Sequence, residues 1–303
     1  MNSVIRKAVS GDQRWKHIYT ACGVFIILLT VAIGAFLIWK GTGTFTTGHH
    51  SLMEFLFSSA WNPSDTPGKY NGHVGAAVYI SGSLMTCGLA LVFVIPFAIG
   101  SAVFLTEISP RIGEKVFRPA VEIYVGIPSV VYGWIGLTVL VPLIRDVFHA
   151  KMGGFSVLAA SIVLAVMIFP TITTVVADAI RSVPDSDREA AYGLGATRWQ
   201  VIRGVVIPTA STGIFTGIIL GLARAIGEAL AVAMVIGKTR SFPDGLLSPT
   251  NNLTAAIASD MGNTANGGEH NMALWSMALL LYLISICLIF IIHKLSRKGS
   301  EQK

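Results

Sequence analysis

Charged residues are scarce in this sequence. Asp, Glu, Lys and Arg make up 13% of its 303 residues, whereas soluble domains carry about 25% charge. Hydrophobic residues make up 53% of the chain, and its mean hydropathy is +0.67. These values exclude an ordinary soluble globular protein and indicate a membrane protein.

Cysteines and catalytic patterns are also sparse. Cys22, Cys87 and Cys287 lie singly in apolar stretches, so they predict neither a disulfide framework nor a metal site. Gly237-Lys238-Thr239 matches the end of a P-loop, but that motif requires glycine where this chain has Val232. The seven histidines form no cluster, and no nucleophile, base and acid can be combined. We therefore expect no catalytic site, no metal and no cofactor bound by this chain.

Long apolar stretches supply the positive evidence for a membrane fold. Ile18–Ile38 and Met272–Ile292 contain no charged residue, and about 20 apolar residues suffice to cross a bilayer. Four more spans are predicted between them, at roughly 80–105, 123–144, 155–177 and 212–237. The sequence thus predicts an all-α membrane protein with about six transmembrane helices.

The distribution of Lys and Arg predicts the orientation. Fifteen of these residues lie in segments on one side of the predicted spans and six lie on the other side. The richer side faces the cytoplasm, so both termini are expected there. The net charge of +6 then follows from topology and anionic lipid, with no nucleic acid as partner. The chain divides into a cytoplasmic segment (1–16), a first transmembrane helix (17–39), an external loop (40–75), a membrane-spanning core (76–293) and a cytoplasmic tail (294–303).

A polar loop at about 179–211 has a spaced pattern of small and charged residues. The pattern consists of Glu189, Ala190, Ala191, Gly195 and Pro208. Capping boxes at Ser186–Glu189 and Thr197–Gln200 predict two short helices. Gly193 and Gly195 interrupt the first of these helices. The small side chains leave a flat surface on which the backbone of a partner can approach closely.

The predicted fifth span combines small residues with two charges. Small residues recur at every fourth position, at Gly213, Gly217, Gly221, Ala225, Ala229 and Ala233, a stripe that lets helices pack closely in lipid. Arg224 and Glu228 are expected one turn apart, roughly 6 Å along one helix. A charge at the middle of the bilayer costs about 2.5–3.5 kcal/mol. Two interpretations stay open: Arg224 attracts an oxyanion while Glu228 holds the empty guanidinium, or the pair only locks helices together.

Hydroxyl groups lie beside two prolines of the predicted spans. Ser129 follows Pro128, and Thr171 and Thr174 follow Pro170. A proline removes a helical hydrogen bond, and a neighbouring hydroxyl can satisfy the freed backbone group. The same hydroxyls can also contact a passing anion, so both roles stay open for Ser129, Thr171 and Thr174.

Several of these stretches resemble the permease subunits of ABC importers. The 189–208 pattern is similar to their EAA loop, which couples a permease to ATPase subunits, and residues 125–133 and 221–232 resemble phosphate-specific permeases. Residues 253–258 are similar to the PstC family. The resemblance implies the type I, MetI-like importer fold, phosphate as the substrate, and ATPase coupling through the EAA loop.

The same resemblance implies partners in a bacterial cytoplasmic (inner) membrane. These are a second, PstA-like permease subunit, two PstB-like ATPase subunits that bind ATP and Mg²⁺, and a periplasmic, PstS-like phosphate-binding protein. Two alternatives stay open. The chain could be a permease for another oxyanion, such as sulfate or molybdate, or a non-transporting membrane scaffold that signals external phosphate.

Overall fold

The computed structural model describes residues 2–66, 68–150 and 152–300, without the side chains of residues 2–14, 122 and 295–300. The long helices are α1 (Asn2–Gly41), α4 (Ala77–Val103), α9 (Val157–Arg181), α13 (Ser211–Gly227) and α16 (Glu269–Ser300). The shorter α-helices are α2 (Gly43–Thr46), α3 (Leu52–Phe57), α5 (Pro110–Ile112), α6 (Arg118–Val125), α7 (Ser129–Ile135), α8 (Val141–Phe148), α10 (Asp185–Gly193), α11 (Arg198–Val201), α12 (Ile207–Thr209), α14 (Leu230–Ala233) and α15 (Leu253–Asp260).

Short turns of other geometry continue several of these helices. Turns of π geometry are η1 (Phe104–Ile108), η2 (Gly113–Phe117), η3 (Gly136–Leu140) and η5 (Ile202–Val206), and 3₁₀ turns are η4 (Met152–Gly154) and η6 (Met261–Asn263). Strands β1 (Trp61–Asn62) and β2 (His73–Val74) pair antiparallel.

The predicted number of membrane helices agrees with the structure. In the described part of the chain, five helices are long and apolar enough to span a membrane. A sixth arises if Arg198–Thr209 and Ser211–Gly227, which meet at 67°, form one bent span. The prediction of a continuous helix over 212–237 is wrong, because α13 ends at Gly227. The helix predicted at 123–144 is likewise interrupted, between Val125 and Ser129.

Helix α9 lies at the centre of the core. More of its residues are buried than in any other described helix, and α4 and α13 cover it on two sides. The predicted stripe of small residues forms the α13 side of this packing, since a Cβ atom at Gly217 would lie 3.2 Å from Val176 and one at Gly221 2.5 Å from Ile172. The stripe ends at Ala225; Ala229 and Ala233 lie beyond the end of α13.

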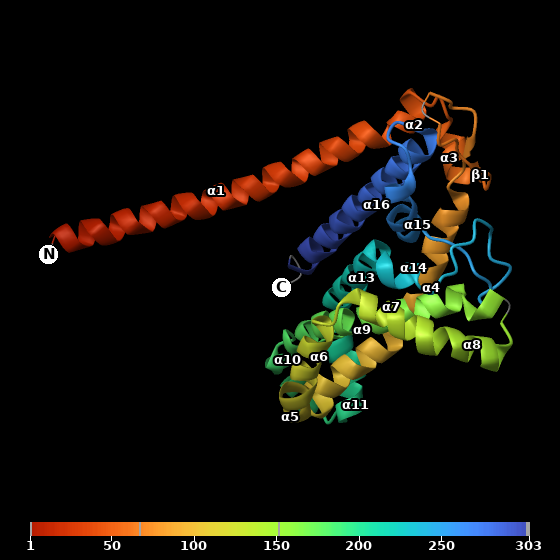
Figure 1. The fold of residues 1–303 in the computed structure, drawn as a ribbon. Helices are drawn as coiled ribbons and strands as arrows, with labels where there is room; N and C mark the ends of the chain where they lie inside the picture. Colours follow the sequence, from red (N-terminus) through yellow and green to blue (C-terminus); the bar gives the residue numbers. More distant parts are fainter. Residues whose placement is uncertain (1, 67, 151, 301–303) are drawn as a thin grey trace.

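Helix α1 projects away from the rest of the molecule (Figure 1). It contacts α16 only near its own C-terminal end, where Gly34 faces Tyr282 and Gly41 faces Leu279. Its other apolar side chains, as far as they are described, are mostly exposed. A surface of this kind is suited to lipid or to another membrane helix.

A buried carboxylate holds together the end of the molecule that contains α2, α3 and β1. Glu269, at the start of α16, is 1% exposed and accepts hydrogen bonds from the backbone N–H groups of Ser64 at 2.6 Å and Gly72 at 3.1 Å. Its Oε1 lies 2.7 Å from His50 Nε2, and His50 also faces Glu54. Described residues of the segment 40–75, predicted as an external loop, therefore pack against the N-terminal end of α16.

Residues 238–271, which join the element after α13 to α16, fold back into the protein. They include α15, whose Leu253, Thr254 and Ala255 are buried against neighbouring helices. Asn252 caps this helix, since its Oδ1 accepts from the N–H of Ala255 at 2.8 Å. Figure 1 shows α10 and α11 at the opposite end of the molecule from α2 and α3.

Candidate functional site

Two membrane segments are interrupted, and the elements beside the breaks pack together. The first break separates α6 from α7, and the second follows α13 at Glu228, whose backbone is extended (φ −77, ψ 120). Helix α7 approaches α14 so closely that a Cβ atom on Gly133 would lie 2.8 Å from the Cα of Ala231. Breaks of this kind expose backbone groups, which membrane proteins tolerate where they are buried in protein or line a path.

Arg224 lies in the last turn of α13, just before the second break. Its side chain is exposed, and its Nη1 donates to the Thr171 hydroxyl of α9 at 3.1 Å. This contact joins two of the predicted pathway residues. Within the described residues, Arg224 makes no ion pair with a carboxylate, and the side chain that accepts a hydrogen bond from it is the uncharged hydroxyl of Thr171.

Glu228 is not placed as predicted. The expected arrangement, with both charges one turn apart on a single helix, is wrong because the helix ends before Glu228. Its Oε1 instead accepts from the N–H of Ala231 at 3.3 Å, and its carbonyl accepts from the Thr254 hydroxyl at 2.8 Å. These contacts hold the broken chain against α14 and α15, and among the described ion pairs none joins Glu228 to Arg224.

The other predicted hydroxyls show two kinds of environment. Thr174 donates to the carbonyls of Pro170 and Thr171, at 2.9 and 3.0 Å, whereas the carbonyl that Pro170 leaves without its helical donor is that of Val166, four residues earlier. Thr174 also borders a cavity of about 260 Å³ whose lining includes Arg181 and Asp178. Ser129 is the first residue of α7 and is half-buried beside the first break.

A tyrosine pair that the sequence reasoning did not single out spans the first break. The Tyr132 hydroxyl of α7 donates to the carbonyl of Tyr124 in α6 at 2.8 Å, and the two ring centres are 5.3 Å apart. Tyr132 also lies within electrostatic reach of Arg224. The available signal was two tyrosines, eight positions apart in the sequence, that flank the Gly126–Pro128 break.

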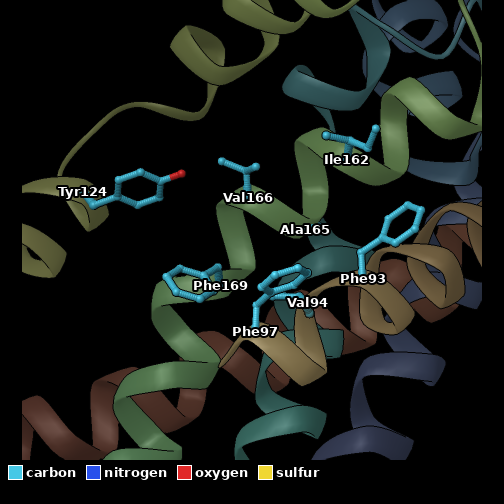
Figure 2. A pocket seen from close by; sticks show the side chains of 8 residues that line it. All are labelled: Phe93, Val94, Phe97, Tyr124, Ile162, Ala165, Val166 and Phe169. Carbon is cyan, nitrogen blue, oxygen red and sulfur yellow. The ribbon is translucent and has the colours of Figure 1, made fainter. Parts of the chain in front are cut away.

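A cavity of about 410 Å³ lies between α4, α6 and α9 (Figure 2). It is lined by Phe93, Val94, Phe97, Tyr124, Ile162, Ala165, Val166 and Phe169. The Tyr124 hydroxyl is the only polar side-chain group among them. Burying an anion without charged or hydrogen-bonding partners costs several kcal/mol or more, so this cavity fits an apolar group and not an oxyanion.

The EAA-like loop has the predicted two-helix form with one local difference. Thr197 and Gln200 form the expected capping box, and Gly195, with φ +81, follows the end of α10. The capping box predicted at Ser186 is wrong: the N-cap is Pro184, two residues earlier, and α10 begins at Asp185. The helix therefore starts without a side-chain cap.

The loop presents a mixed surface. Of the predicted coupling residues, Glu189, Ala190, Gly195 and Pro208 are exposed, while Ala191 is partly buried against the core. Three apolar side chains not predicted from the sequence are exposed beside them: Tyr192 (46%), Leu194 (91%) and Trp199 (63%). Exposed apolar side chains in a polar loop indicate a protein contact. Their exposure could not be predicted from the sequence, because it depends on how the two helices are oriented.

The comparisons with known proteins decide the family. Residues 94–300 match the family of binding-protein-dependent transport system inner membrane components. The chain belongs to this family. It is 47% identical to the probable ABC transporter permease protein YqgH of Bacillus subtilis, over 95% of this chain and 91% of that protein. It is 36% identical to the phosphate transport system permease protein PstC of Pasteurella multocida, over 86% and 84% of the two chains.

The fold of this ABC permease agrees with its family. It is similar to a chain of the bacterial alginate ABC transporter solved in complex with an alginate pentasaccharide-bound periplasmic protein. The TM-score is 0.56 at 18% identity, over 94% of this permease and 97% of that chain. The predicted importer fold and the resemblance to PstC permeases are confirmed. Membership also implies a multi-pass membrane protein that acts with a second permease subunit, an ATPase and a substrate-binding protein.

Proposed function

We propose that this permease forms part of the translocation path of an ATP-driven phosphate importer in the bacterial cytoplasmic (inner) membrane. Its proposed partners are a PstA-like permease, two PstB-like ATPase subunits and a PstS-like periplasmic phosphate-binding protein. The chain itself would hydrolyse no ATP, because ATP and Mg²⁺ would bind to the ATPase subunits. The likeness to PstC of Pasteurella multocida supports phosphate as the substrate.

One observation carries the proposal for the path. The guanidinium of Arg224 is exposed where two interrupted membrane segments meet, and a single neutral hydroxyl accepts from it. A guanidinium has five N–H donors, so donors remain for a ligand. Phosphate presents charged oxygens that suit the planar fork of arginine. Thr171 would orient the fork, and Glu228 would keep the adjacent break in place.

Labelled phosphate uptake by the complete complex tests this role. Hydrogen bonds to a charged group contribute about 1.5–3 kcal/mol, so Arg224→Gln should lower uptake about 10–150-fold while the complex still assembles. Arg224→Lys should keep part of the activity, because it retains the charge without the fork. Arg145→Gln is the matched control, since Arg145 is exposed and pairs with its neighbour Asp146 at 2.7 Å.

Two further measurements separate the alternatives. Competition by unlabelled sulfate or molybdate, stronger than competition by phosphate, would make this a permease for another oxyanion. The double variant Arg224→Gln/Glu228→Gln should stay inactive, because the structure contains no ion pair between the two for it to relieve. Full phosphate transport by that double variant would end the pathway role of Arg224.

A further inference from the structure

Two arginines of the EAA-like loop bind the ends of two membrane segments. Arg188, in α10, donates to the carbonyl of Ile180 in the last turn of α9, to that of Val183 just beyond the helix, and to the Asp185 carboxylate. Arg198, at the start of α11, donates to the carbonyls of Glu107 and Ile108 at the end of η1. Carbonyls at the end of a helix lack intrahelical partners, so each guanidinium caps one segment.

Glu107 joins these two caps. Its Oε1 accepts from Arg188 Nη2 at 3.0 Å, while its backbone carbonyl accepts from Arg198. The side chains of Arg188 and Glu107 are only 16% and 12% exposed. A largely buried ion pair with several hydrogen bonds resists separation more than an exposed pair does, because breaking it leaves a buried charge without a partner.

We propose that Arg188 is a positioning residue that, with Glu107, transmits movement of the EAA-like loop to α4 and α9 together. The inference rests on the proposed function and deepens it. Helices α4 and α9 pack along much of their length, so a loop fixed to both ends moves them as one body. Thr171, the contact of Arg224, lies on α9 nine residues before Ile180, which is about 14 Å at 1.5 Å per residue.

This role predicts uncoupling, which differs from loss of docking. The ATPase subunits would still bind the exposed surface of the loop, because its exposed apolar residues Tyr192, Leu194 and Trp199 take no part in the hydrogen bonds of Arg188 and Glu107. ATP hydrolysis would continue, but the loop would move without carrying α4 and α9. Arg188→Lys retains the charge but lacks the planar fork that serves several acceptors at once, so it should fall between the natural protein and Arg188→Gln.

The test uses the complete complex in proteoliposomes, with labelled phosphate and a parallel measurement of ATP hydrolysis. Arg188→Gln and Glu107→Gln should each lower phosphate uptake about tenfold or more, while hydrolysis stimulated by the binding protein falls less than about threefold. Arg111→Gln, an exposed arginine in neighbouring α5, should keep the natural ratio of phosphate transported to ATP hydrolysed. A proportional fall of uptake and hydrolysis, or an unchanged ratio, would overturn the inference.

Glu107→Gln decides the matter if Arg188→Gln does not assemble. It leaves the bonds from Arg188 to Ile180 and Val183 in place and removes only the charged link to η1. An assembled Glu107→Gln complex with the natural ratio would overturn the inference. A wrong proposed function gives a different result: the natural complex itself would not transport phosphate. In that case the same ratios are measured with sulfate or molybdate, and a natural complex that moves none of these anions removes both proposals.

Discussion

The closest contact between α9 and α13 predicts a compensating pair of substitutions. A Cβ atom added at Gly213 would overlap the Cβ of Ala179 and would lie 3.4 Å from the Ala179 Cα. Gly213→Ala therefore pushes the helices apart, because alanine has no rotamer with which to move aside. Overpacking costs about 1–3 kcal/mol, against a gain of about 1 kcal/mol for replacing glycine in a helix. We expect a net loss of up to about 2 kcal/mol.

The reciprocal substitution should restore the interface. Ala179→Gly removes the atom that the new methyl group would strike, and it costs about 1 kcal/mol on its own through lower helix propensity. The double variant keeps one glycine and one alanine across the contact, so the propensity differences cancel. Its stability should return to within about 0.5 kcal/mol of the natural protein, a strong coupling between neighbouring residues.

Thermal unfolding of the four detergent-solubilised forms measures this coupling. At about 2–4 °C per kcal/mol, the shift seen for domains of about 150–250 residues, Gly213→Ala should lower the midpoint by up to about 8 °C. The matched control is Gly100→Ala in α4, where an added Cβ meets no atom within 4 Å, and its midpoint should stay level or rise. Equal melting of Gly213→Ala and Gly100→Ala would refute the reasoning, as would a double variant less stable than either single one.

Two further predictions concern the two ends of the molecule. Burial raises the pKa of Glu54, but hydrogen bonds from His73 and His50 outweigh burial and hold that pKa below its ordinary 4.5. A lowered pKa stabilises the folded state above pH 4.5, and this stabilisation is lost as the pH falls through the folded-state value. The natural protein should therefore have a higher midpoint of thermal unfolding than Glu54→Gln near neutral pH. This difference in midpoint should disappear in acid. At the other end, Ala190→Trp and Gly195→Asp should each lower ATP-driven uptake about tenfold or more at normal membrane levels, by obstructing a close protein contact. Gly193→Ala, where an added Cβ meets no atom within 4 Å, is the control, and normal uptake by the first two variants would remove the docking role.

Local patterns in the sequence predicted the features that have local causes. The apolar runs correspond to the spanning helices, and Thr197 and Gln200 form their predicted capping box because both partners lie within one helical turn. The glycine stripe of α13 was also predictable, since its four-residue period is a property of the helix itself. The cap predicted at Ser186 is absent because α10 begins at Asp185 and its N-cap is Pro184, two residues before Ser186.

The features that were missed depend on residues far apart in the chain. Gly227–Ala233 consists mainly of small and apolar residues that are compatible with a continuing helix, yet the chain breaks at Glu228. Thr254, twenty-six residues later, donates to the Glu228 carbonyl. Arg188 likewise entered the sequence reasoning only as a cytoplasmic charge, because its partner Glu107 lies eighty-one residues earlier. Neither contact produces a periodic pattern in the residues near it in the sequence, so a reading of short stretches cannot detect it.

The position of Pro170 connects the two proposals. A proline inside a helix removes a hydrogen bond and permits bending at that point, and Pro170 immediately precedes Thr171 in α9. If the loop moves the end of α9 through Arg188, the displacement reaches the bendable part of the helix at the residue that contacts Arg224. The Thr174 hydroxyl, bonded to the Pro170 carbonyl, supports the backbone there without restoring the missing N–H. The contact between Thr171 and Arg224 is therefore the first part of the proposed path that loop movement would alter.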